Sequence, residues 1–299
     1  MHIMFDGFTT FDVTVEPGVT IHGVRGGKGP ALLLLHGYPQ SYVIWHRVAG
    51  ELAKRYSVVA LDLRGYGKSS KPRGTANHDN YSKRVMADDC VQVMRQLRHD
   101  EFYVCGHDRG ARVAHSMMTQ YPDRVLKAML LDISPTLTMY SETNFDFARA
   151  YFHWFFLIQP SPLPESLILG DPGAFMRCFM GSRVDTRIFD PACLSSYIED
   201  MSKEDAVHAS CEDYRASATV DLDDARADIA AGRLIRCPLH VLWGKKGVIE
   251  RLFDAIHDWK TVSANPALVD GYAIDSSHYI PEECPQELLK NMFEFFQGK

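Results

Sequence analysis

An aspartate stands at a strand-to-helix junction in the sequence Phe102-Tyr-Val-Cys-Gly-His-Asp-Arg-Gly-Ala-Arg112. An apolar run stops at Gly106 and a helix-like segment follows, so Asp108 falls at the turn between them. Small residues at Gly106 and Gly110 permit a tight, strained turn that lifts the central side chain above a sheet. A carboxylate held there can attack carbon through oxygen and form an ester with the enzyme. Asp and Gly are also common in ordinary surface turns, so the motif needs support from elsewhere in the chain.

Three further segments supply that support. His36-Gly-Tyr-Pro39 directly follows an apolar run, Asp132 follows another, and His278 lies between the last expected strand and the last helix. Each has a structural alternative, because His36 can cap a strand, Asp132 can cap a helix, and a lone histidine is often structural. Ligands of open α/β sheets bind at the carboxyl ends of strands, where all three fall. Their coincidence favours a catalytic interpretation.

The elements that must position these residues alternate between short apolar runs and amphipathic segments, which predicts an α/β fold with a mostly parallel sheet covered by helices. From about Thr136 to Ala227 this alternation stops, and aromatic-rich helical segments separated by prolines take its place. We therefore predict an α/β core formed by residues 1–136 and 228–299, with a helical cap inserted at 137–227. The expected strands are 8–15, 19–24, 31–35, 57–61, 102–105, 126–131, 238–243 and 268–274; the expected helices are 42–55, 82–98 and one that begins at 281.

The composition excludes several classes of protein. The chain has 299 residues and a net charge of −6 with no basic cluster, which argues against a nucleic-acid partner. No apolar run approaches the length of a membrane span and no signal peptide begins the chain, so a cytoplasmic location and no membrane association are expected. The 7 cysteines include no Cys-x-x-Cys pair, so neither a disulfide framework nor a zinc site is indicated. The segment Gly65-Tyr-Gly-Lys-Ser69 mimics part of a phosphate loop, but Asp62 stands where its first glycine belongs.

The chain resembles the α/β-hydrolase-fold enzymes that use an aspartate nucleophile, the branch that contains dehalogenases and epoxide hydrolases. The resemblance covers nearly the whole length and rests on His36-Gly-Tyr-Pro39, Asp62-Leu-Arg-Gly-Tyr-Gly-Lys-Ser69 and Gly106-His-Asp-Arg-Gly110. Within the branch the chain is most similar to the fluoroacetate and haloacetate dehalogenases. The segments that carry this narrower similarity are Asp108-Arg-Gly-Ala-Arg112, Leu131-Asp-Ile133, His153-Trp154 and Cys211-Glu-Asp-Tyr214.

The narrower resemblance implies a small anionic haloacid as the substrate. Arg109 and Arg112 lie three residues apart on the helix that begins at the elbow, so they can share one face beside Asp108 and bind the substrate carboxylate. The resemblance further implies that His153, Trp154 and Tyr214 hold the departing halide through their N–H and O–H groups. From the residues alone, the segment 151–157 is better interpreted as the apolar face of a cap helix, and the two interpretations are compatible.

The resemblance also implies a reaction in two steps. Asp108 displaces halide from the α-carbon and becomes an ester. His278, oriented by Asp132, then activates water, and the amides of Tyr38 and Arg109 stabilise the oxyanion. The products are glycolate and halide, and no metal or other cofactor is required.

Two departures from the resemblance concern the expected pocket wall. Relatives carry a tryptophan in the segment that here reads Cys178-Phe-Met-Gly-Ser-Arg-Val184, and a tyrosine at the position of Met139. A roomier, less polar pocket would favour chloro- or bromoacetate, or larger 2-haloacids.

Two other functions stay open. One is an epoxide hydrolase, although such enzymes usually have tryptophan where this chain has Arg109; the other is a non-catalytic ligand receptor. The family resemblance also suggests that the protein is a homodimer.

Overall fold

A computed structural model describes residues 4–182 and 184–297 and contains one eight-stranded sheet. The strand order is β1-β2-β4-β3-β5-β6-β7-β8; β2 pairs antiparallel with β1 and β4, and all other pairs are parallel. The predicted α/β-hydrolase architecture is confirmed, and each predicted strand is present within two residues of its expected ends. The strands are β1 Thr9–Glu16, β2 Val19–Gly26, β3 Ala31–Leu35, β4 Ser57–Leu61, β5 Phe102–His107, β6 Val125–Leu131, β7 Leu239–Gly244 and β8 Val269–Ile274.

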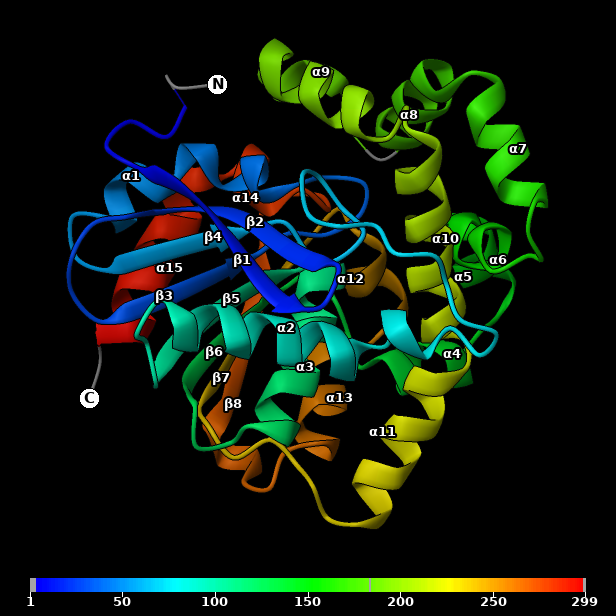
Figure 1. The fold of residues 1–299 in the computed structure, drawn as a ribbon. Helices are drawn as coiled ribbons and strands as arrows, with labels where there is room; N and C mark the ends of the chain where they lie inside the picture. The colour runs from blue at the N-terminus through cyan, green and yellow to red at the C-terminus, as the bar shows by residue number, and fades with distance from the viewer. Residues whose placement is uncertain (1–3, 183, 298–299) are drawn as a thin grey trace.

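The central strands are apolar because helices cover both faces of the sheet. All five residues of β3 are buried, as expected for a parallel strand between two helical layers. Figure 1 shows α2 (Lys83–Gln96), α3 (Arg109–Gln120) and α13 (Ala255–Thr261) on one face, with α1 (Ala49–Leu52) and α15 (Pro285–Gln297) on the other. The short helices α12 (Val248–Leu252) and α14 (Ile280–Glu283) follow β7 and β8.

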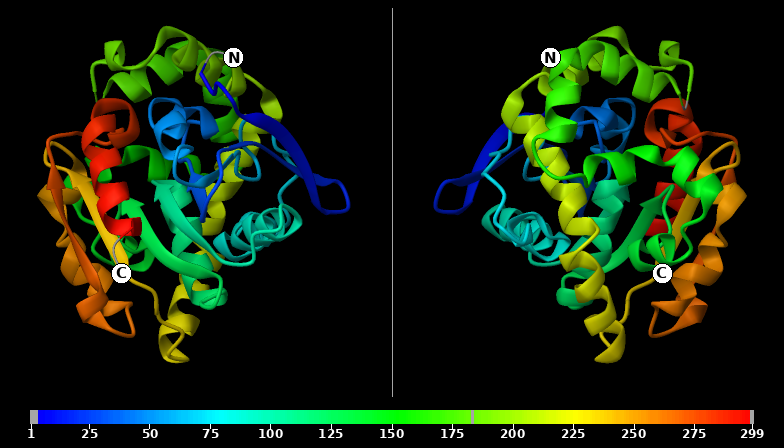
Figure 2. Two further views of the ribbon diagram at one scale, coloured as in Figure 1. Left: turned by 90° about the vertical axis from the view of Figure 1, so that its left-hand side faces the viewer. Right: turned by 90° about the vertical axis from the view of Figure 1, so that its right-hand side faces the viewer.

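Between β6 and β7 the described chain contains helices and loops but no named strand, and we call α4–α11 the helical insertion. Figures 1 and 2 show it arching over one end of the sheet, in green to yellow. The division into core and cap at the expected residues stays a prediction. The helices are α4 Thr136–Ser141, α5 Phe145–Ala150, α6 Phe152–Leu157, α7 Leu163–Gly170, α8 Pro172–Gly181, α9 Pro191–Asp200, α10 Glu204–Ser217 and α11 Val220–Ala230.

The segment predicted as one helix over 42–55 is different in the structure. It forms a 3₁₀ helix, Tyr42–Arg47, followed by the single short turn of α1. The β-branched residues Val43, Ile44 and Val48 and then Gly50 lower the helix propensity of this stretch. The aspartate of the Asp62 motif also accepts the N–H of Tyr42 at 2.9 Å, which anchors the first turn to a loop. Among the described residues, no helix is both long and apolar enough to cross a membrane.

Candidate active site

Asp108 occupies the predicted sharp turn between β5 and α3. Its backbone has φ 48° and ψ −113°, a conformation that a non-glycine residue adopts only under strain. Close packing makes this turn possible, because a Cβ on Gly110 would lie 2.4 Å from the carbonyl oxygen of His36. A Cβ on Gly37 would lie 2.4 Å from the Cβ of Asp108. The two glycines therefore let the loop after β3 approach the elbow.

The loop after β3 presents a backbone donor to the Asp108 carboxylate. The N–H of Tyr38 donates to Oδ1 of Asp108 at 2.9 Å. His36 fixes this loop, since its Nε2 accepts the N–H of Leu63 at 3.0 Å, which leaves the proton on Nδ1 to donate to the Gly37 carbonyl at 2.9 Å. Burial lowers the pKa of His36 to about 4, so this bonding pattern persists at neutral pH. His36 thus positions the Tyr38 amide, one half of the predicted oxyanion hole.

His278 lies between two carboxylates, with one ring nitrogen near Asp132 and the other near Asp108. Nδ1 of His278 lies 2.6 Å from Oδ2 of Asp132, and Nε2 lies 3.8 Å from Oδ2 of Asp108. The other oxygen of Asp132 accepts the N–H of Gly244 at 3.0 Å. Because Asp132 holds one ring nitrogen, the opposite nitrogen faces the elbow, where a general base must stand. The loops after β5, β6 and β8 bring these three residues together.

The charges around Asp108 keep its carboxylate ionised. Burial opposes ionisation, but attraction to His278 and His107 and to the two nearby arginines outweighs burial and lowers the pKa to about 2. An ionised oxygen is the nucleophilic form of a carboxylate. Asp108 is 3% exposed, so bulk water does not compete strongly for its oxygens.

Arg109 lies beside the nucleophile, but an internal carboxylate occupies one edge of its guanidinium. Its Nε donates to Oδ2 of Asp213 at 2.9 Å and its Nη2 donates to Oδ1 at 2.7 Å. Nη1 has no hydrogen-bond partner among the described residues. The ring of Tyr214 packs 4.1 Å from the guanidinium carbon. Arg109 therefore has one donor group, Nη1, left for a ligand. Its Nε and Nη2 cannot bind a ligand carboxylate together, because both already donate to Asp213.

Arg112 is held differently. Nη1 donates to Oγ1 of Thr136 at 2.8 Å and Nη2 contacts Sδ of Met139 at 3.1 Å, while Nε has no partner among the described residues. Arg112 pairs with no carboxylate in the described part of the chain, although it is 2% exposed. Burial and repulsion from Arg109 lower its pKa. This buried cation has no carboxylate oxygen within 4 Å among the described residues, and a thioether is a weak acceptor that a ligand oxygen can replace.

The three predicted halide-binding residues line adjoining parts of the site. The ring centroids of His153 and Tyr214 lie 5.7 Å apart, and both rings pack against Tyr38. Trp154 instead packs under Arg112, whose guanidinium carbon lies 4.7 Å from the centroid of the Trp154 ring. The indole N–H of Trp154 is buried and has no hydrogen-bond partner among the described residues. His153 and Tyr214 thus form one wall, while Trp154 belongs equally to the arginine side of the site.

Sequence reasoning missed several residues that shape the site. Asp213 stood within a quoted motif, but nothing in its spacing showed that it would pair with Arg109. Phe179 packs 5.0 Å from the ring of His153 and 5.3 Å from the ring of Tyr38, within the segment noted for lacking tryptophan. Tyr151 packs 5.2 Å from His153. Position 183 of that segment lies outside the described residues.

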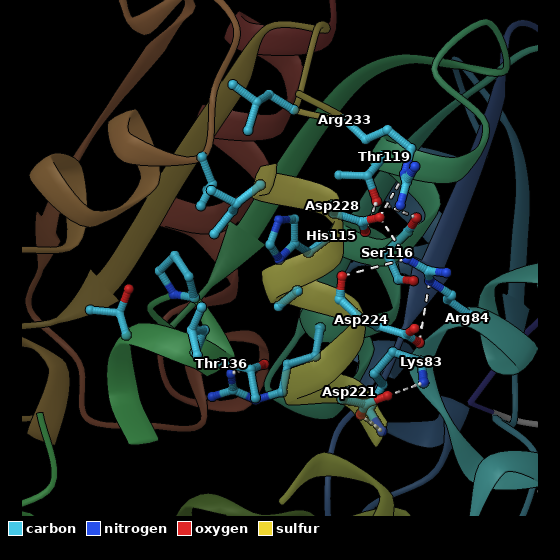
Figure 3. A pocket seen from close by; sticks show the side chains of 18 of the residues that line it. Lys83, Arg84, His115, Ser116, Thr119, Thr136, Asp221, Asp224, Asp228 and Arg233 are labelled. Atoms are coloured by element: carbon cyan, nitrogen blue, oxygen red, sulfur yellow. Dashed lines mark hydrogen bonds and ion pairs between the residues drawn. The ribbon is translucent and has the colours of Figure 1, made fainter. Parts of the chain in front are cut away.

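A separate cavity of about 100 Å³ lies on the far side of Arg112, between α3, α4, α11 and α13 (Figure 3). Ion pairs between α2 and α11 border it, including one from Arg84 to Asp228. It touches Arg112 and Thr136 but neither Asp108 nor His278. The cavity in Figure 3 therefore lies at a junction between the helical insertion and the α/β core. In residues 4–182 and 184–297, no group of three or more His, Cys, Asp or Glu could hold a metal ion.

Comparison with known proteins defines the class. Residues 30–170 match the family described as alpha/beta hydrolase fold. The protein ALR0039 of Nostoc sp PCC 7120 superimposes with a TM-score of 0.94 and is 46% identical, covering 99% of this chain and 100% of that one. The chain belongs to the α/β-hydrolase-fold family.

Two curated relatives narrow the similarity. A fluoroacetate dehalogenase of Burkholderia sp is 42% identical over 294 residues, which cover 98% of this chain and 95% of that protein. A soluble epoxide hydrolase of Corynebacterium sp. (strain C12) is 28% identical, over 93% of this chain and 94% of that protein. The predicted similarity to dehalogenases of the α/β-hydrolase fold is confirmed. These relatives also support a hydrolase activity for this chain.

Proposed function

We propose that this protein hydrolyses the carbon–halogen bond of haloacetates, with Asp108 as the nucleophile. The observation that carries the proposal is the buried Arg112, a cation without a carboxylate partner in the described chain, one helical turn from an ionised aspartate. Asp213 already balances the charge of Arg109, so Arg112 supplies the unpaired positive charge. The 42% identity to a fluoroacetate dehalogenase supports the same assignment.

Electrostatics explains why such a substrate needs this cation. A second carboxylate about 4 Å from Asp108 would cost on the order of 4 kcal/mol at an effective dielectric constant near 20. In the proposed complex, Arg112 and the remaining Nη1 of Arg109 bind the substrate carboxylate and offset that repulsion. The α-carbon then faces Asp108, which attacks it as halide leaves toward His153, Trp154 and Tyr214.

Hydrolysis of the ester is the second proposed step. His278 removes a proton from water, and the water oxygen attacks the Asp108 carbonyl carbon. The Tyr38 N–H, which already contacts Oδ1 of Asp108, supports the oxyanion, together with the amide of Arg109. Collapse of this intermediate breaks the bond to the glycolate oxygen, which takes up the proton held by His278, and the Asp108 carboxyl group loses its remaining proton to solvent and is restored as a carboxylate.

Halide release from chloroacetate and fluoroacetate tests the proposal. Wild-type enzyme should release halide, and Asp108→Asn should lower the rate by at least about a thousandfold because a neutral amide oxygen is a far weaker nucleophile than a carboxylate oxygen. Arg112→Gln should reduce turnover of chloroacetate far more than turnover of neutral chloroacetamide, since only the former has a charge for Arg112 to bind. Equal losses on both substrates would contradict the proposed role of Arg112.

An epoxide hydrolase is the second candidate, because the insertion places the phenols of Tyr151 and Tyr214 on buried rings near the elbow. An aryl epoxide assayed in parallel discriminates the two enzymes. Epoxide opening without halide release would replace the dehalogenase proposal, and binding without turnover of either substrate would favour a receptor.

A further inference from the structure

The candidate chemistry is enclosed, so a substrate must reach it through a wall of side chains. Asp108 is 3% exposed, His278 4% and Arg109 0%. One solvent-facing cleft of about 240 Å³ reaches this wall, and we call it the access cleft. It lies between α5, the end of α8, the segment 246–251 and the loop that carries His278.

The access cleft meets the candidate triad directly. Asp132, His278 and Tyr151 form part of its lining. Tyr151 is 3% exposed, and its ring centroid lies 6.5 Å from that of His278 and 5.2 Å from that of His153. Tyr151 therefore lies in the cleft lining and also packs against His153, one of the predicted halide-binding residues.

The rim of the access cleft is basic in a protein of net charge −6. Arg149, Lys246 and Arg251 line the cleft together with two carboxylates, Asp146 at the rim and the fully buried Asp132. Lys246 pairs with Asp275 at 2.8 Å, outside the cleft lining. Arg149 and Arg251 are exposed and form no ion pair among the described residues. The rim thus carries an excess of positive charge where the rest of the surface, on balance, repels anions.

We propose that the access cleft is the route by which a small carboxylate substrate reaches Asp108, and that Arg149 and Arg251 concentrate the anion there. The inference rests on the proposed function for the identity of the anion. Its physical basis is long-range attraction: the Debye length grows from about 8 Å at physiological salt to about 30 Å at 0.01 M. The two arginines act before the chemical step, so they are positioning residues.

An engineered thiol measures the local anion concentration without requiring turnover. Ser182 is an exposed residue of the cleft lining, and Ser182→Cys can be alkylated by anionic iodoacetate or neutral iodoacetamide. The ratio of the two rates at position 182, read by peptide mass spectrometry, cancels differences in thiol reactivity. Adding Arg149→Gln and Arg251→Gln should lower this ratio about fivefold at 10 mM salt and by less than about twofold at 0.5 M.

A matched control carries the same change of net charge elsewhere. Arg95 and Lys28 are exposed and do not line the access cleft. In the Ser182→Cys background, Arg95→Gln with Lys28→Gln should leave the ratio unchanged. A ratio that the two pairs of substitutions lower equally, or that neither lowers, would overturn the proposed attraction.

Turnover then tests whether the cleft is the route. Ala150→Trp places a large ring in the lining and should reduce kcat/KM at least tenfold for chloroacetate and chloroacetamide alike. Arg149→Gln with Arg251→Gln should lower kcat/KM for chloroacetate alone and leave kcat unchanged. Full activity of a folded Ala150→Trp enzyme would reject the route. If wild-type enzyme releases no halide from either substrate, the proposed function fails, and the alkylation ratio still decides whether the cleft attracts anions.

Discussion

At the scale of single residues, the proposed reaction gives His278 and Asp108 roles in different steps. Nε2 of His278 lies 3.8 Å from Oδ2 of Asp108, so a water that donates to His278 is within reach of the Asp108 carboxyl group. Displacement of halide needs only the ionised Asp108, whereas ester hydrolysis needs a base. We therefore expect the histidine to act in the second step of the proposed reaction.

Replacing His278 with alanine should consequently trap the ester. After incubation with chloroacetate, mass spectrometry of His278→Ala should show one added carboxymethyl group, located by peptide mapping on the peptide that contains Asp108. Turnover should fall by at least about a thousandfold, while one equivalent of chloride is still released. A doubly substituted His278→Ala, Asp108→Asn protein is the control and should remain unmodified. Unmodified His278→Ala would contradict the two-step reaction.

At the scale of elements, one buried carboxylate of helix α10, that of Asp213, bonds to three separate parts of the core. Asp213 accepts hydrogen bonds from Arg109 of α3, Lys83 of α2 and Tyr66 of the loop after β4. It is 0% exposed, and attraction to Arg109 and Lys83 outweighs its burial and holds its pKa well below the usual range. The same carboxylate orients Arg109 and fastens the helix that carries Tyr214.

Asp213→Asn should therefore destabilise the protein strongly. Removing one partner of a buried ion pair costs about 3–5 kcal/mol, because the remaining cations stay buried without compensation. Ser217→Ala is the matched control on the same helix, since it removes one neutral partner of Arg109 at 3.0 Å and should cost only about 1–2 kcal/mol. Urea unfolding of both variants makes the comparison. Similar losses of unfolding free energy would show that Asp213 is not the main attachment.

Sequence patterns predicted the elements whose positions follow from chain order. Asp108, Asp132 and His278 all follow strands, and parallel strands bring their carboxyl ends to one edge, so their meeting could be foreseen. The pairing of Asp213 with Arg109 could not, because it depends on how α10 docks and rotates over the sheet. Phe179 was missed for the same reason. The prediction of one helix over 42–55 was wrong, because the first turn of this segment is anchored by Asp62, which lies in a loop distant in the sequence.

At the scale of the whole molecule, Glu282 joins the helical insertion to the core. Its carboxylate accepts the hydroxyl of Tyr197 in α9 at 2.8 Å and lies 3.7 Å from Nε of Arg47 in the 3₁₀ helix. Burial raises the pKa of Glu282 to about 7, and the attraction to Tyr197 and Arg47 only partly opposes this effect. The folded protein thus holds a proton that the unfolded chain, with an ordinary pKa of 4.5, releases more readily.

This difference makes stability depend on pH in a definite direction. Between pH 4.5 and about 7 the folded state binds more protons than the unfolded state at this site, so the free energy of unfolding falls as pH rises. The whole effect is at most on the order of 3 kcal/mol, from about 1.4 kcal/mol per pKa unit.

Glu282→Gln keeps an acceptor for Tyr197 but removes the charge. It should match the wild type near pH 5 and exceed it near pH 8 in urea unfolding. Glu294→Gln, an exposed position on α15, should change neither value. A Glu282→Gln protein that is less stable than the wild type at pH 8 would mean that the ionised pair with Arg47 stabilises the junction by more than the burial of its charge costs.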